Sequence, residues 1–303
     1  MSPVRTPRGE IPERVTASHP CPLCERERWC CYWADGTVLC TSYPSDKPVS
    51  TGWVHKPNGE VRMTKDAEKA AAVDRQRIVK FVAAACAKVT SADKRRIARL
   101  LGVPEFAVAE SPGVFTGRDA GGPFDGFVMS SPDPSTGLWT ACGYSRRYAD
   151  GSKKAVGRLG LFLPPAVAAG GGVLFVVEGA SDVLAMYGAG LEAVGRPSNI
   201  AGSELVTEYV FGYPAGTWRA VVVVAENDEK EDGLSPGLSG SCAVADRVRA
   251  AMRAAKRPMP VFVRSMLGAA KDPRAWFKLS GYSEASAGSL HSHLTAGIRR
   301  AES

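Results

Sequence analysis

Three short apolar runs of the chain lead into acidic side chains. Val173–Val177 is followed by Glu178, Val221–Ala225 by Glu226-Asn227-Asp228, and Val261–Val263 by Lys271-Asp272 further on. Short, wholly apolar runs are typical of buried strands in a parallel sheet, and open α/β sheets bind ligands where such strands end. A single acid at a strand end is common on protein surfaces, whereas three in order predict one acidic edge. Hard divalent cations such as Mg²⁺ prefer carboxylate oxygens, so this edge could hold one.

A second group of candidate ligands is a cluster of cysteines near the start of the chain. Five of the eight cysteines lie between Cys21 and Cys40. Clustered cysteines in a cytoplasmic chain are more often metal ligands than disulfides. Cys21 and Cys24 are separated by two residues, so both thiolates can bind one tetrahedral Zn²⁺. Four protein ligands leave no open position for a substrate, so we expect this zinc to be structural.

The second pair of zinc ligands must come from the three cysteines that follow. Asp35-Gly36 predicts a turn that returns Cys40 to the metal, and we choose Cys30 as its partner. Cys31 is the alternative to Cys30, and His19 is an outside candidate. The predicted zinc ligands are Cys21, Cys24, Cys30 and Cys40.

The acidic motifs carry a family resemblance. Glu178-Gly179 with Asp182, followed by an acid-x-Asp pair, resembles the Toprim domain of bacterial-type DNA primases, topoisomerases and some nucleases and recombination proteins. The resemblance implies that Glu178 matches the family's glutamate, and that Glu226 and Asp228 match its Asp-x-Asp pair. Asp272 lies in a Lys-Asp-Pro segment similar to one in primases. Glu226 departs from the pattern, because aspartate is usual there and glutamate reaches one methylene further. The resemblance therefore implies Mg²⁺ or Mn²⁺ bound by Glu178, Glu226, Asp228 and Asp272, with Glu178 as a ligand or a proton acceptor.

A basic hairpin is expected before the acidic motifs. The segment 145–154 reads as two strands joined by a turn at Asp150-Gly151. It is similar to the basic subdomain that precedes Toprim in primases, where an arginine and a lysine hold template or nucleotide phosphate. The positions that match are Arg146 or Arg147 with Lys153 or Lys154. As ordinary surface charges of a hairpin, these side chains would need no function.

The expected fold class is α/β. A Toprim core (Rossmann-like, with a mainly parallel sheet) would follow a small mixed α+β basic subdomain and an N-terminal zinc β-ribbon. The predicted domains are a zinc-ribbon DNA-binding module at 1–60, a helical linker at 61–104, the basic subdomain at 105–165 and Toprim at 166–303. Expected helices are 66–89, with a break near Asp74, then 92–101 capped by Ser91, 183–187 and 241–256; expected further strands are 127–129, 139–144 and 193–194. Residues 229–240 read as an exposed polar insertion.

Charge and hydropathy narrow the class of protein. The formal net charge is +7, and residues 1–104 hold 18 Lys+Arg and 11 Asp+Glu, while residues 105–303 hold 20 of each. A basic module beside a neutral one with an acidic site suits a polyanion held by one part and processed by the other. The sequence contains neither an apolar run long enough to cross a bilayer nor a signal-peptide core, so we expect a cytoplasmic protein with no membrane partner.

The order of zinc ribbon, basic hairpin and Toprim motifs resembles that of a primase. The resemblance implies metal-dependent synthesis of short RNA primers from nucleoside triphosphates on single-stranded DNA. The sequence lacks a Walker A pattern, so a replicative helicase would be a separate partner. The alternatives are a Toprim nuclease that hydrolyses phosphodiesters, and a non-catalytic zinc and Toprim DNA-binding protein of recombination or replication.

Overall fold

The chain divides into two compact units. The computed structural model describes residues 13–16, 18–23, 30–34, 36–40, 48–49, 52–55, 65–165, 172–198, 201–228, 235–257 and 259–298. The first unit is Met1–Arg77 and the second is Ile78–Ser303. The division falls inside helix α1 (Lys65–Cys86), and not at either end of the expected linker 61–104. Helix α1 runs without the expected break near Asp74, since no proline or glycine interrupts it.

The first unit contains a small antiparallel sheet. Its strand order is β1-β2-β3-β5-β4. The strands are β1 (Glu13–Arg14), β2 (Cys31–Tyr32), β3 (Val38–Cys40), β4 (Pro48–Val49) and β5 (Gly52–His55). Among the described residues of this unit, one buried cluster contains Val15 and Val38 together with three cysteines, Cys21, Cys30 and Cys40. Small domains often use a metal bound by such cysteines to stabilise their fold.

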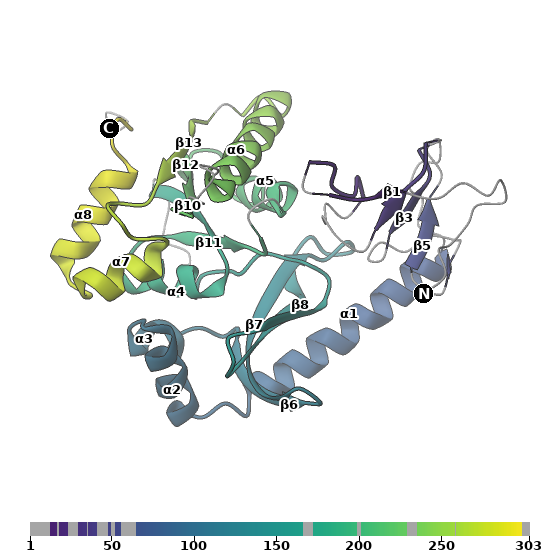
Figure 1. Ribbon diagram of the computed structural model, residues 1–303, viewed down its shortest axis with the longest axis horizontal. Helices are drawn as coiled ribbons and strands as arrows, with labels where there is room; N and C mark the ends of the chain where they lie inside the picture. The colour runs from purple at the N-terminus through teal and green to yellow at the C-terminus, as the bar shows by residue number, and fades with distance from the viewer. Residues whose placement is uncertain are drawn as a thin grey trace. The chain divides into compact units, whose positions relative to one another are not determined.

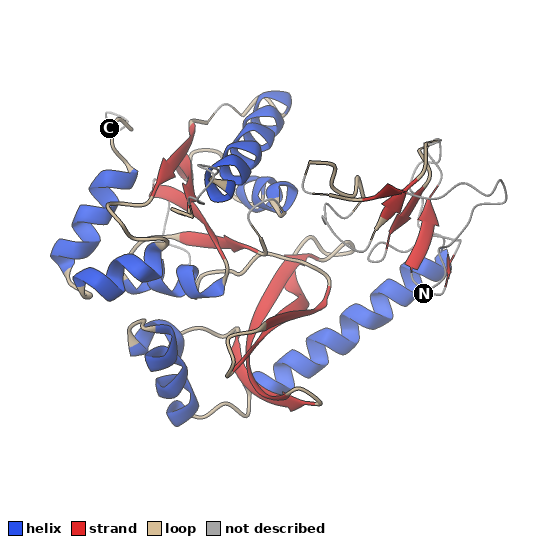
Figure 2. Cartoon of the chain, viewed as in Figure 1, coloured by secondary structure: helices blue, strands red, loops and turns tan. Residues whose placement is uncertain are grey.

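The second unit contains two sheets, seen in Figure 1 and by type of element in Figure 2. The antiparallel sheet has the order β6-β7-β8-β9 and the parallel sheet the order β11-β10-β12-β13. The strands are β6 (Val114–Asp119), β7 (Gly122–Pro132), β8 (Trp139–Tyr148), β9 (Lys153–Gly157), β10 (Gly172–Glu178), β11 (Ala193–Arg196), β12 (Trp218–Ala225) and β13 (Val261–Ser265). The helices after α1 are α2 (Ser91–Leu101), α3 (Glu105–Ala109), α4 (Ala180–Gly188), α5 (Ser203–Phe211), α6 (Pro236–Ala254), α7 (Pro273–Ser280) and α8 (Glu284–Leu294).

Helices cover both faces of the parallel sheet. Side chains of a strand alternate between faces, so Phe175 and Val177 of β10 join one apolar cluster with α4, α7 and α8. Leu174 and Val176 join the other, with α5 and α6. Burial on both faces explains why β10 and β12 are continuous apolar runs in the sequence. The predicted α/β class with a mainly parallel core sheet is confirmed.

The antiparallel sheet packs against the second half of α1. Val82 of α1 lies in one buried cluster with the rings of Phe115, Phe124, Tyr144 and Tyr148. These two tyrosines are an even number of residues apart on β8, so they share one face of that strand. The opposite face of β8 is therefore directed away from the aromatic cluster.

Helix α2 is part of the core and not only a linker. Its buried residues Ile97 and Leu101 lie in the same cluster as one face of the parallel sheet. The cap of this helix is Thr90 and not Ser91 as expected, because Thr90 and Asp93 exchange two hydrogen bonds of 3.0 and 3.1 Å in a capping box. Gly102 ends the helix in the left-handed conformation.

Helix α6 begins earlier than the sequence predicts. It starts at Pro236, so residues 236–240 are its first turns and not the end of an exposed insertion. Gly237 and Gly240 are buried there. Pro236 fits the first helical position, because proline lacks only an N–H that is unpaired at a helix start. Residues 229–234 of the expected insertion lie outside the described part of the chain.

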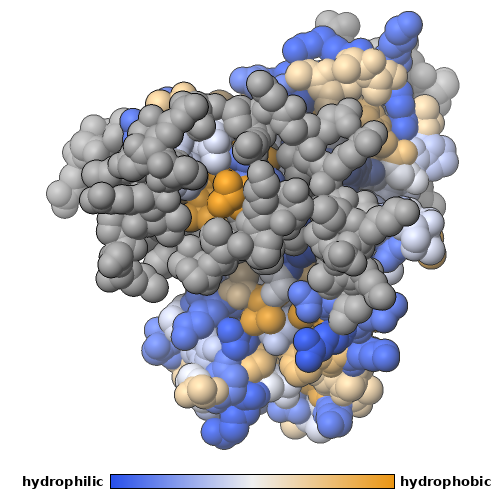
Figure 3. Space-filling model, turned by 90° about the vertical axis from the view of Figure 1, so that its right-hand side faces the viewer, coloured by the Kyte–Doolittle hydropathy of each residue, from blue (hydrophilic) through white to orange (hydrophobic). Residues whose placement is uncertain are grey.

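The face of the molecule drawn in Figure 3 mixes hydrophilic and weakly apolar residues, with strongly hydrophobic ones confined to small patches among the coloured atoms. Within the described residues, every helix is too short or too polar to span a lipid bilayer.

Candidate metal and nucleotide site

Three carboxylates converge at the carboxyl edge of the parallel sheet. Oxygen atoms of Asp182, Glu226 and Asp272 all lie within 4.8 Å of one another. Asp182 is in the first turn of α4, Glu226 directly follows β12, and Asp272 is the N-cap of α7. Oxygens bound to one Mg²⁺ at about 2.1 Å lie at most about 4.2 Å apart, so small side-chain movements would let all three bind one ion. The donor set therefore fits a hard divalent cation.

Asp182 is the acid that our assignment of ligands from the sequence missed. Its side chain is buried, at 3% relative exposure, and it accepts a 3.4 Å hydrogen bond from the backbone N–H of Arg274. Burial raises the pKa of Asp182 well above its usual range, and the nearby charges of Asp272 and Glu226 raise it further. A signal for this residue was present, since it is the second acid of the Glu-Gly-x-x-Asp motif and follows Glu178 by about one helical turn.

Glu178 lines the same pocket but is not one of the three converging acids. It is the last residue of β10. Burial raises the pKa of its carboxyl, and the charge of Glu226 adds to this, while Arg196 opposes it. A raised pKa makes a carboxylate a stronger base, so Glu178 suits proton transfer.

Asp228 is placed differently from our expectation of a metal ligand. Its Oδ1 accepts a 2.8 Å hydrogen bond from the backbone N–H of Gly237, in the first turn of α6. A carboxylate at that position is favourable, because the first N–H groups of a helix are unpaired and the helix dipole is positive there. Asp228 thus anchors α6 behind the acidic edge and is not grouped with the three acids.

Basic side chains lie among the acids. Lys271 Nζ is 3.2 Å from Glu226 Oε2, and this pairing raises the pKa of Lys271. Asp272 Oδ1 accepts a 2.6 Å bond from the N–H of Ala275, and its Oδ2 is 3.9 Å from the Arg274 guanidinium. Asp272 is the N-cap of α7, and the hydrogen bond from Ala275 holds its side chain in place.

The basic hairpin and the acids line one pocket. The pocket has a volume of about 190 Å³, and its wall includes Ser145, Arg147 and Lys153 together with Glu178 and the three converging acids. Arg147 and Lys153 are cross-strand partners between β8 and β9. Burial lowers the pKa of Arg147, as does the nearby charge of Arg274. The sequence left the register of this hairpin open, and Arg147 and Lys153 are the pair that lines the pocket.

The neighbouring pair, Arg146 and Lys154, lies on the aromatic side of the hairpin. Arg146 forms an ion pair with Asp119 and lies 5.9 Å from the centre of the Tyr148 ring. Lys154 Nζ lies 5.4 Å from the centre of the same ring. Because strand side chains alternate between faces, the pair that contacts Tyr148 cannot also line the pocket.

A buried arginine that sequence reasoning missed lies beside the acidic edge. Arg196, the last residue of β11, has 1% relative exposure and donates to the Ser198 carbonyl (3.2 Å) and the Ser241 hydroxyl (3.4 Å). Burial lowers its pKa to about 10, although the charges of Glu178 and Glu226 oppose this shift. Buried arginines are rare unless they are paired with an acid. In the sequence, the signal for Arg196 is a charged residue at the end of a predicted strand.

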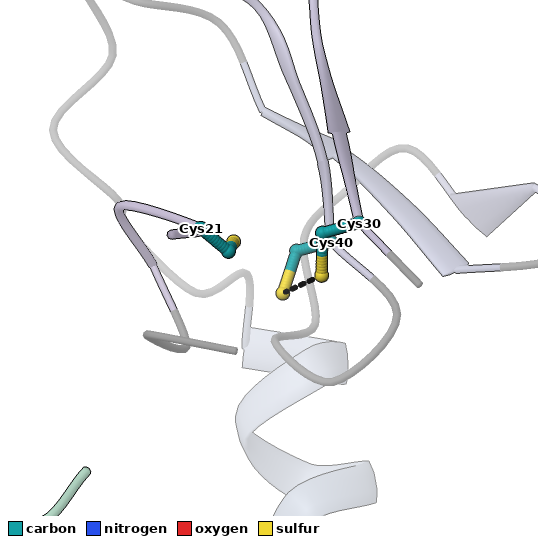
Figure 4. Close-up of side chains that lie close together, drawn as sticks. All are labelled: Cys21, Cys30 and Cys40. Atoms are coloured by element: carbon teal, nitrogen blue, oxygen red, sulfur yellow. Dashed lines mark hydrogen bonds between the residues drawn. The ribbon is translucent and has the colours of Figure 1, made fainter. Parts of the chain in front are cut away.

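Three cysteine sulfurs converge in the first unit, as Figure 4 shows. Cys21, Cys30 and Cys40 are buried, and the Sγ atoms of Cys30 and Cys40 are 4.0 Å apart. Two thiolates on a tetrahedral zinc with bonds of about 2.3 Å lie about 3.8 Å apart, so the three sulfurs fit Zn²⁺. Cys31 is outside this cluster, and burial raises the pKa of its thiol. Cys24 lies outside the described residues.

His19, the outside candidate for zinc, is not part of the cysteine cluster. It is exposed, and its ring stacks against Tyr32 with ring centres 6.2 Å apart. The structure therefore groups Cys30, and neither Cys31 nor His19, with Cys21 and Cys40.

Among known proteins, similarity to this chain was found for solved structures. No family model matches the chain, and no curated protein does. The chain is similar to the DnaG catalytic core (14% identity, TM-score 0.49, covering 74% of this chain and 80% of that one). It is also similar to the DnaG primase catalytic domain bound to single-stranded DNA, with 13% identity and a TM-score of 0.48, over 75% of this chain and 82% of that one. A third similar structure contains the zinc-binding and RNA polymerase domains of the Aquifex aeolicus primase, with 14% identity and a TM-score of 0.43, over 77% of this chain and 64% of that one.

Proposed function

We propose that this protein is a primase-like nucleotidyltransferase that joins ribonucleotides into short RNA primers on single-stranded DNA, with Mg²⁺ or Mn²⁺. The observation that carries the proposal is the pocket that is lined by three converging carboxylates together with Arg147 and Lys153. A nucleoside triphosphate needs both kinds of group, since its phosphates bind cationic side chains directly and bind carboxylates only through a metal ion.

Each group in the pocket has a role in this proposal. Asp182, Glu226 and Asp272 hold the cation, which when bound would screen the charge of the phosphates and of the leaving pyrophosphate. Arg147 and Lys153 contact phosphate oxygens and orient the nucleotide for in-line attack. The Glu178 carboxylate accepts the proton of the attacking 3′-hydroxyl, for which its raised pKa suits it.

The first unit would bind the template. Cys21, Cys30 and Cys40, with Cys24 as the predicted fourth ligand, hold a structural Zn²⁺ in this proposal. The sequence near these cysteines combines cations and aromatic rings, as proteins that bind single strands do. A separate replicative helicase is the expected protein partner.

The hairpin offers a matched pair of variants for the test. Lys153→Ala removes a cation that lines the pocket, and Lys154→Ala removes its likewise exposed neighbour on the other face of the strand. A hydrogen bond to a charged group is worth about 1.5–3 kcal/mol, so we expect Lys153→Ala to lower kcat/KM for primer synthesis by about 10- to 100-fold. Lys154→Ala should retain the wild-type value. The assay is incorporation of labelled ribonucleotides on mixed-sequence single-stranded DNA.

Other results would assign another function. Equal activity of the two lysine variants would refute the assignment of the phosphate contact. Cleavage of DNA without nucleotides, lost in Asp182→Asn, would instead identify a nuclease. DNA binding with neither reaction would identify a non-catalytic binding protein.

A further inference from the structure

The segment that carries Lys271 and Asp272 has no regular structure before α7. It follows β13, and Asp272 is the first residue that α7 fixes, as its N-cap. The position of the Asp272 carboxylate relative to Glu226 and Asp182 therefore depends on α7 on one side and on residues 266–271 on the other.

One side chain holds this segment from inside the acidic motif. The side-chain amide nitrogen of Asn227 lies 3.3 Å from the carbonyl oxygen of Met266, 3.2 Å from that of Gly268 and 2.9 Å from that of Ala270. The backbone N–H of Asn227 donates a 2.8 Å hydrogen bond to the carbonyl of Lys271. Four carbonyl oxygens of one short loop therefore face a single residue.

The amide group suits this task better than the side chains on either side of it. Carbonyl oxygens only accept hydrogen bonds, so the group among them must be a donor. The amide nitrogen has two hydrogens to share among the three carbonyls. A carboxylate at 227 would place an acceptor there, and an alanine would leave the carbonyls to water.

The contacts link two of the three acids. Glu226 precedes Asn227, and Asp272 follows Lys271, whose carbonyl accepts the Asn227 N–H. We propose that Asn227 is a positioning residue of the metal site, which fixes the loop 266–271 so that the Asp272 carboxylate stays within reach of Asp182 and Glu226. This inference rests on the proposed metal site but not on the reaction that the site performs.

The test measures Mn²⁺ binding by the full chain, from the electron paramagnetic resonance signal of free Mn²⁺. Residues that orient metal ligands typically contribute 10- to 100-fold to affinity, so Asn227→Ala should raise the Kd by about tenfold or more. Thr90→Ala, which removes the cap of α2 away from the site, is the control for general destabilisation and should bind Mn²⁺ as wild type does.

A double-mutant cycle separates positioning from a direct effect on the metal. If Asn227 acts through Asp272, then Asn227→Ala should change the Kd little further in an Asp272→Asn background. Amide hydrogen exchange in residues 266–272 should also increase in Asn227→Ala. This readout keeps the test valid if a variant binds too weakly to measure.

Two results would overturn the inference. One is a wild-type Kd in Asn227→Ala, and the other is an effect that simply adds to that of Asp272→Asn. A wild-type protein that binds Mn²⁺ but makes no primer would refute the proposed function and leave the role of Asn227 standing. A wild-type protein that binds no Mn²⁺ at this edge would refute both.

Discussion

Gly237 lies where α6 begins against the acidic edge, and replacing it by alanine probes how tightly that edge is packed. A Cβ at this position would lie 2.8 Å from the Asp228 Oδ1 atom and 2.8 Å from the backbone carbonyl oxygen of Glu226. Carbon atoms do not approach oxygen so closely, and the carbonyl can move only if the end of β12 moves with it. The new methyl group would also disturb the 2.8 Å hydrogen bond from the Gly237 N–H to Asp228.

The sign of the effect follows from two opposing terms. Overpacking typically costs about 1–3 kcal/mol. Alanine in place of glycine inside a helix returns about 0.5–1 kcal/mol, because glycine loses more backbone freedom on folding. We therefore expect Gly237→Ala to lower the free energy of unfolding by up to about 2.5 kcal/mol.

Gly288 of α8 is the matched control. It is exposed in the middle of a helix, and a Cβ there would meet nothing within 4 Å. The same substitution should therefore stabilise by about 0.5–1 kcal/mol. One kcal/mol shifts the melting temperature of a unit of this size by about 2–4 °C, so Gly237→Ala should melt up to about 10 °C lower and Gly288→Ala about 1–4 °C higher. Calorimetry measures both, and shifts of the same sign would contradict the packing described here.

Two further predictions concern the acids and the cysteines. Burial raises the pKa of Asp182, so its ionisation opposes folding, and this cost grows as the pH rises above the unfolded pKa of about 3.9. Without metal, Asp182→Asn should therefore be more stable than wild type at pH 7, and this difference in stability should shrink towards pH 4. Chemical denaturation of both proteins at the two pH values measures the difference, and a difference that is independent of pH would contradict the prediction. Cys30→Ser should lose the bound zinc while Cys31→Ser retains it, as measured by metal content after gel filtration, and the reverse result would exchange their roles.

The sequence predicted the core of the fold because burial left a clear pattern. The runs Val173–Val177 and Val221–Ala225 became most of β10 and β12, since strands covered on both faces consist mainly of apolar residues. Glu226 and Asp272 were predicted from their positions after strands. Asp182 escaped our ligand assignment because it lies on α4, past the turn that ends β10.

Other details depend on contacts that no local pattern encodes. Asp228 follows β12 as the sequence suggests, but its carboxylate accepts a hydrogen bond from Gly237, which comes after residues 229–234 in the chain. The facing pair of the hairpin was undecided because two cations are adjacent on each strand. The positions of Tyr144 and Tyr148 decide which pair faces the pocket. These tyrosines share with Arg146 the face of β8 that packs on α1, so Arg147 must point to the opposite face.

The three acids of the site lie far apart in the sequence and belong to different connections of the parallel sheet. An ion bound by all of them would act as a removable cross-link between the ends of β10, β12 and the segment after β13. Because the unfolded chain lacks this site, the ion would stabilise the fold by about 2.7 kcal/mol at a free concentration of 100 times its Kd. The free concentration of the divalent cation would then determine how strongly the strand ends are held together. The melting temperature measured at several metal concentrations would therefore report the metal affinity with no substrate present.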